Sequence, residues 1–203
     1  MSTAMSYKPT AEEVKKLRER TQAPMMDCRN ALLEAGGSFE KAEKQLMERG
    51  QVQAAKKSER VANEGLVTSY IHAGGKIGVL VEVNSETDFV ARSSQFGELA
   101  RDIAMHIAAM SPAYIDRESV PEDVIAQARS AFTAAVPPGK PLEVAAKIVE
   151  GKLNKWYEEN CLLDQPFVKD DNISVNELIG SVVGVLKERI RVRRFAKFGL
   201  GES

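Results

Sequence analysis

A change of period at Glu64 is the feature that most constrains the fold. Upstream of it, apolar residues recur at helical spacing. Downstream, the sequence follows a two-residue period through residues 66–73 and again through residues 77–84, with Gly74-Gly75 between the two runs. Two such runs joined by a Gly-Gly pair predict a β-hairpin. The chain therefore combines helices with an antiparallel sheet, which places it in the α+β class.

The region before the hairpin predicts three short helices. Thr10-Ala11-Glu12-Glu13 forms a capping box that opens the first helix. Gly36-Gly37 stops the second helix, and Ser38 is a plausible N-cap for the third, which we expect Gly50 to end. With a polar helical linker behind it, this region is expected to form a helical domain over residues 8–57.

The remainder, residues 58–203, is expected to be a second domain of about three antiparallel strands packed with helices. We expect the third strand at Ile190 to Phe198, where Arg193-Arg194 breaks the alternation and predicts a bulge or an edge position. Capping boxes at Ser119 to Glu122 and Ser174 to Glu177 predict two further helix starts. Helical patterns cover about residues 89–111, 122–135, 142–160 and 174–186, and residues 162–172 are expected to be irregular.

Composition and charge argue against several classes of protein. Charged residues make up 28% of the chain, but the net charge is −1, which does not suggest binding through nucleic-acid phosphates. No apolar run approaches the length of a membrane span, and the N-terminus lacks the regions of a secretory signal. We therefore expect a cytoplasmic protein without a nucleic-acid or membrane partner. The alternative is an RNA-binding protein that uses the basic run 187–197.

Residue types give no sign of catalysis. Cys28 and Cys161 are far apart and form neither a CxxC pair nor a cluster with ligand spacing, so we expect packing roles and no metal or cofactor. His72 and His106 have no local partner motif and are expected to be structural or exposed. The chain is therefore predicted not to be an enzyme, although a hydrolase or transferase whose catalytic residues lie far apart in sequence stays an alternative.

Two features are not explained by packing alone. Asp88 and Phe89 stand together at the junction between a strand and a helix, and Met25-Met26 opens a helix. In one interpretation Asp88 is a helix N-cap, Phe89 turns inward and both methionines lie in a core. In the other interpretation these side chains point outward to a protein partner, for which methionine is well suited.

Several motifs carry a resemblance to a known family. They are Val14 to Thr21, Met25-Met26-Asp27-Cys28, Ile77 to Asn84 running into Glu86-Thr87-Asp88-Phe89-Val90, Ile103 to His106, Gln165-Pro166-Phe167-Val168 and Arg194-Phe195. In this order they cover nearly the whole chain, which resembles bacterial elongation factor Ts. The resemblance implies a guanine-nucleotide exchange factor for elongation factor Tu in translation elongation, with both GDP-bound and nucleotide-free elongation factor Tu as partners.

The resemblance also implies roles for particular residues. The first domain would be ubiquitin-associated-like, and Met25 and Met26 would pack on a helix of the partner's G domain. Asp88 and Phe89 would insert into that domain and disturb the Mg²⁺ and phosphate site, with Phe89 as a wedge. Thr87 and Val90 complete the expected contact site.

The sequence departs from the family in places. Thr21-Gln22-Ala23-Pro24 stands where a Gly-rich turn is usual, and Ser85 stands where Cys is common. The chain resembles the short members, which have a single core module. These members are thought to compensate by dimerising, so a homodimer is expected.

Overall fold

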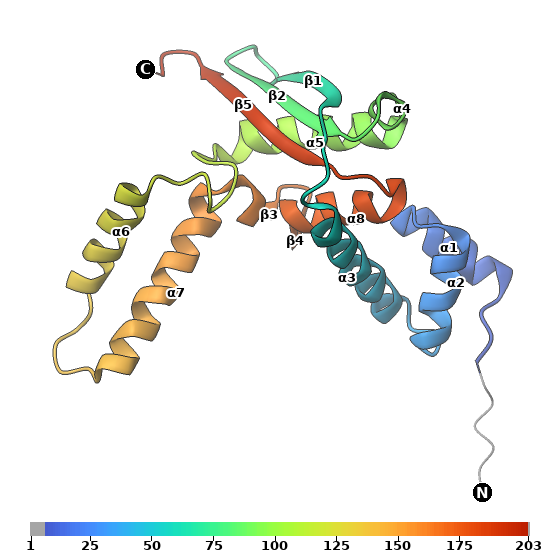
Figure 1. Ribbon diagram of the computed structural model, residues 1–203, viewed down its shortest axis with the longest axis horizontal. Helices are drawn as coiled ribbons and strands as arrows, with labels where there is room; N and C mark the ends of the chain where they lie inside the picture. Colours follow the sequence, from blue (N-terminus) through green and yellow to red (C-terminus); the bar gives the residue numbers. More distant parts are fainter. Residues whose placement is uncertain (1–6, 203) are drawn as a thin grey trace, which may run out of the picture. The chain divides into compact units, whose positions relative to one another are not determined.

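The computed structural model describes residues 7–202 and has the predicted α+β architecture (Figure 1). Its contacts divide into two compact units. The first unit holds the chain up to Leu66, Val83–Leu99 and Glu177–Arg191, and the second holds Val67–Glu82, Ala100–Asn176 and the chain from Val192. In chain order the elements are α1 (Ala11–Thr21), α2 (Met25–Glu34), α3 (Phe39–Lys57), β1 (Glu64–Ile71), β2 (Ile77–Ser85), α4 (Asp88–Ala91), α5 (Ser94–Met110), α6 (Glu122–Ala134), α7 (Leu142–Asn160), the 3-10 helix η1 (Leu162–Asp164), β3 (Pro166–Phe167), β4 (Asp170–Ser174), α8 (Val175–Leu186) and β5 (Arg191–Gly199).

Helices α1, α2 and α3 pack around a small apolar core. The predicted capping box opens α1, since Thr10 Oγ1 accepts from the backbone N–H of Glu13 and the Glu13 carboxylate accepts from that of Thr10. Ser38 caps α3, as predicted. The buried residues of this core are Val14, Leu17, Ala23, Cys28, Ala31, Leu32 and Ala42. The predicted domain boundary after residue 57 stays a prediction.

The prediction that Gly50 ends the third helix is wrong. Helix α3 runs through Gly50 to Lys57. A Cβ at Gly50 would lie 2.6 Å from the carbonyl oxygen of Gly180 in α8, closer than two such atoms approach. Gly50 therefore serves a close crossing of two helices, and that contact outweighs the low helix propensity of glycine.

A three-stranded antiparallel sheet has the order β1-β2-β5. The predicted hairpin is confirmed, with Gly74 and Gly75 at φ +90° and +69° in the turn, a region that favours glycine. Strand β2 buries Val79, Val81 and Val83. The third strand forms close to the predicted residues, and the sheet order confirms its edge position.

Helices α6 and α7 pack against each other in the second unit around Val120, Leu153, Tyr157 and Cys161. The capping box predicted from Ser119 is wrong. The Ser119 hydroxyl instead donates to the carbonyl of Asp116, and α6 begins after Pro121 without a side-chain cap. Pro121 is the N-cap, with φ −58° and ψ 140°, and proline is tolerated there because the N–H that it lacks would have no partner within the helix.

Residues 162–172, predicted to be irregular, contain η1, β3 and the start of β4. The two-residue strand β3 is too short to leave a periodic signal. Beside it, His106 Nε2 lies 2.9 Å from Gln165 Oε1, and His106 Nδ1 accepts from the backbone N–H of Val168. Burial lowers the pKa of His106, which favours the neutral ring. Its full burial, with both ring nitrogens in contact with polar groups of the fold, fits the structural role expected of it.

Candidate functional site

The junction between β2 and α4 is built on Thr87. Thr87 is the N-cap of α4, and its hydroxyl accepts from the backbone N–H of Val90 at 3.4 Å. Asp88 therefore occupies the first helical position, and the interpretation of Asp88 as the N-cap is wrong. Its carboxylate lies 2.9 Å from the guanidinium of Arg92, one turn later, and remains 61% exposed.

Phe89 projects into solvent, with 82% of its surface exposed. Val90, the next residue, is only 5% exposed. Successive helical residues point in directions about 100° apart, so burying Val90 turns Phe89 outward. Leaving a Phe side chain in water forfeits about 1.5–3 kcal/mol of burial free energy. The folded chain recovers little of this, so the ring is available to a partner.

The first turn of α2 exposes both predicted methionines. Met25 is 43% exposed and Met26 is 60% exposed, whereas Cys28 and Leu32, further along the same helix, are fully buried. The interpretation that both methionines lie in the core is therefore wrong. Helix α2 and the turn 87–90 belong to the same compact unit, so all six predicted contact residues lie in one part of the fold.

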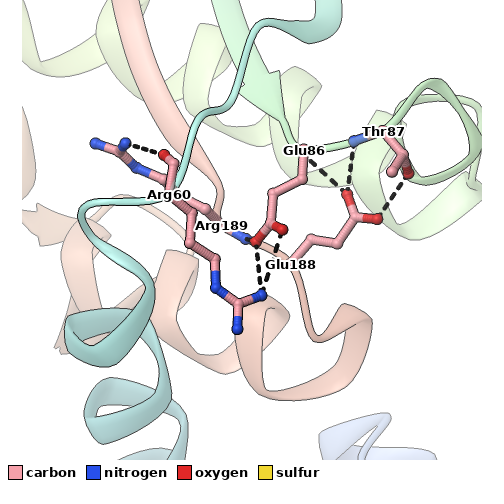
Figure 2. Close-up of polar contacts among 5 residues, drawn as sticks. All are labelled: Arg60, Glu86, Thr87, Glu188 and Arg189. Atoms are coloured by element: carbon pink, nitrogen blue, oxygen red, sulfur yellow. Dashed lines mark hydrogen bonds and ion pairs between the residues drawn. The ribbon is translucent and has the colours of Figure 1, made fainter.

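A carboxylate from the far end of the sequence supports the turn (Figure 2). Glu188 Oε2 accepts from the backbone N–H groups of Glu86 and Thr87 at 3.1 and 3.0 Å. Glu188 Oε1 accepts from the Thr87 hydroxyl at 2.6 Å. One side chain thus holds three polar groups of the segment that leads into Asp88.

A second carboxylate, that of Glu86, makes the reverse contact, from the turn to the backbone next to Glu188. Glu86 Oε1 accepts from the backbone N–H of Arg189 at 2.6 Å, and Arg60 lies 3.3 Å from Glu86 Oε2 (Figure 2). The hydrogen bond from Arg189, with the charge of Arg60, lowers the pKa of Glu86. Glu86 is therefore ionised at neutral pH and joins the two chain segments.

Glu188 and Arg189 were missed as site residues because they lie in the basic run 187–197. The only signal in the sequence was an acid among cations. Within that run, Arg193 and Arg194 both pair with Glu82, at 3.2 and 2.7 Å. This pairing favours the solvated edge of a sheet over a surface for RNA phosphates.

The described residues offer little for catalysis or metal binding. Among residues 7–202, no group of three or more His, Cys, Asp and Glu residues could hold a metal ion. Both cysteines are buried, and burial raises their pKa values, that of Cys161 to about 11. A neutral, buried thiol is a packing group. Over the same residues, no helix has the length and hydropathy needed to cross a membrane.

Comparison with known proteins identifies the family. The model of the family "Elongation factor TS" matches residues 6–202. The elongation factor Ts of Syntrophomonas wolfei is 54% identical over 96% of this chain and 91% of its own length. That of Koribacter versatilis is 54% identical over 95% and 89% of the two chains, and that of Caldanaerobacter subterraneus is 52% identical over 96% and 98%. The chain therefore belongs to the elongation factor Ts family, the nucleotide exchange factors of elongation factor Tu in translation elongation.

Proposed function

We propose that the chain releases GDP from elongation factor Tu by inserting Phe89 between helices of the G domain. The exposed ring of Phe89 carries this proposal. A rigid aromatic group that enters a crevice is a typical binding hot spot. Asp88 stands beside it with an exposed carboxylate and pairs with polar groups of the partner. In this mechanism the ion pair between Asp88 and Arg92 breaks when the turn enters the G domain, and the Asp88 carboxylate then pairs with polar groups of the partner.

The insertion acts on the nucleotide indirectly. GDP is held by backbone N–H groups of a phosphate loop and by Mg²⁺, which bridges phosphate and protein oxygens. Displacing the structure that carries these groups weakens GDP binding. Binding free energies are coupled reciprocally. A factor that binds nucleotide-free elongation factor Tu more tightly than the GDP-bound form must therefore lower the affinity for GDP by the same factor. The partner is bound in both its GDP-bound and nucleotide-free states, and the chain is an exchange factor rather than a catalytic enzyme.

The remaining predicted contacts divide into two roles. Met25 and Met26 are exposed on α2 and pack against a helix of the partner, where flexible thioether side chains adapt to the surface. Val90 is buried, and Thr87 caps α4, so these two residues hold the turn rather than offer a large contact area. The three helices of residues 8–57 form the ubiquitin-associated-like domain that carries the methionines.

We also propose a homodimer in the bacterial cytoplasm, where translation elongation takes place. One surface of the second unit exposes four large apolar side chains around a shallow hollow: Ile71, Leu80, Phe198 and Leu200. Isolated apolar residues are ordinary on a surface, but a cluster indicates an interface. We assign a second copy of this chain to it, since the short members of the family are thought to act as dimers. A mass of 22.3 kDa at micromolar concentration with full exchange activity would refute the dimer.

The exchange proposal is tested by release of fluorescent GDP from elongation factor Tu. The wild-type chain should accelerate release, and Phe89→Ala should lose about 30-fold or more, the effect of a hot spot of at least 2 kcal/mol. Leu142→Ala is the matched control, because Leu142 is 90% exposed but belongs to the other unit. Full activity of Phe89→Ala would remove the wedge from the mechanism.

A further inference from the structure

We infer that Glu188 is a positioning residue for exchange: it fixes the turn that presents Asp88 and Phe89 to elongation factor Tu. The inference rests on the proposed insertion of this turn. It assigns a role to a side chain outside the contact site, about one hundred residues away along the chain.

Helix α4 cannot hold itself in place. It has four residues, whereas isolated helices shorter than about 12 residues are marginal in water. The Phe89 ring is exposed and therefore does not anchor α4 in the core, and within α4 only Val90 is buried. Further support must therefore come from outside the turn.

Glu188 supplies that support through an ordered chain of hydrogen bonds. Its carboxylate can only accept, so the Thr87 hydroxyl must donate to it. The lone pairs of that hydroxyl are then free to accept from the N–H of Val90, which is the cap of α4. The direction of the Thr87 hydroxyl, and with it the start of the helix, is thus set by Glu188.

The position of Glu188 is itself fixed by the reciprocal bond. The backbone N–H of Arg189, the next residue, donates to Glu86, while Glu188 accepts from the backbone of Glu86. The two segments therefore hold each other in both directions (Figure 2). Charge-assisted hydrogen bonds are roughly twice as strong as neutral ones, which makes this pairing stiff.

A pre-formed turn matters most for insertion. If the turn were loose, the partner would have to order it during insertion and lose part of the binding free energy. The initial binding of the partner through Met25 and Met26 on α2 would be less affected, because it does not use the turn. Loss of Glu188 should therefore lower the maximal rate of GDP release more than it raises the half-saturating concentration of the factor.

The test compares Glu188→Gln with Glu34→Gln in the GDP-release assay. In Glu188→Gln one oxygen becomes an NH₂ group, which faces donors and cannot accept from them. The maximal rate should fall about tenfold, the equivalent of one charge-assisted bond. Glu34 also carries an ion pair, with Arg49 at 2.5 Å, but does not contact the turn, so its variant should stay within about twofold.

A double-mutant cycle with Thr87→Val separates positioning from general damage. If Glu188 acts in part through the Thr87 hydroxyl, the double variant should lose clearly less than the sum of the two single losses. Additive losses would overturn the inference, as would a Glu188→Gln rate equal to that of Glu34→Gln. If Glu188→Gln fails to fold, Thr87→Ser must keep the rate and Thr87→Val must lose it.

The Phe89→Ala variant, run in parallel, distinguishes the two proposals. Activity of Phe89→Ala at the wild-type level overturns the insertion of the turn, and the inference on Glu188 falls with it. Loss of activity in Phe89→Ala with full activity in Glu188→Gln overturns the role of Glu188 alone.

Discussion

Phe89 and Phe96 are the same residue type, seven positions apart, in opposite environments. Phe89 is 82% exposed in α4, and Phe96 is completely buried in α5. In one unbroken helix, residues seven apart would lie on nearly the same face. The chain instead breaks between Ala91 and Ser94, where the Ser93 hydroxyl accepts from the backbone N–H of Phe96 and starts a new helix. The break allows one ring to stabilise the fold and the other to meet a partner.

The largest expected effect comes from Phe96→Ala. Removing a fully buried ring should lower the free energy of unfolding by about 3–5 kcal/mol, because contacts are lost and a cavity remains. Urea unfolding followed by circular dichroism measures the change. A loss below about 1 kcal/mol, the typical effect of an ordinary substitution, would show that Phe96 is not a core residue.

Phe89→Ala should show the opposite pattern. Its free energy of unfolding should stay within about 0.5 kcal/mol of the wild type, as for other exposed positions, while GDP release falls as described. The same urea titration provides the measurement. If stability drops to the extent seen for Phe96→Ala, then the ring contributes to a core in solution, and the comparison between the two rings is lost.

Helix α2 repeats the comparison on a smaller scale. Met26→Ala should weaken association with elongation factor Tu by about 1 kcal/mol, roughly fivefold, and leave stability nearly unchanged. Leu32→Ala, on the buried side of the same helix, should cost about 2–5 kcal/mol of stability. Titration calorimetry for Met26→Ala and urea unfolding for both variants test this. Equal binding by Met26→Ala and the wild type would remove α2 from the interface.

The smallest expected effect is the loss of stability at acidic pH that comes from Glu86. Glu86 has a folded-state pKa below its ordinary value of 4.5, so its contribution to stability is complete above that pH and is lost as the pH falls through the folded pKa. Wild-type chain should therefore be more stable than Glu86→Gln at about pH 6, and the difference should shrink below about pH 4.5. Urea unfolding across this range measures it. A difference that does not change with pH would mean that the charge of Glu86 is not what joins the segments.

Local patterns predicted much of the fold. The capping box at Thr10, the hairpin turn at Gly74-Gly75 and the third strand all formed as expected, because their signals lie within a few residues of each other. The same reasoning failed at Gly50 and Ser119. At these positions a contact with Gly180 and a bond to Asp116 outweighed the local preference.

The sequence by itself was enough to predict the family and the α+β class. It also marked Asp88, Phe89, Met25 and Met26 as candidate contacts for a protein partner. Only the tertiary structure decided which of these side chains face solvent. It alone revealed that Glu188 reaches Thr87 across about one hundred residues. Periodicity describes which residues share a face of one element, whereas exposure and hydrogen-bond partners depend on which elements meet, and no local pattern carries that information.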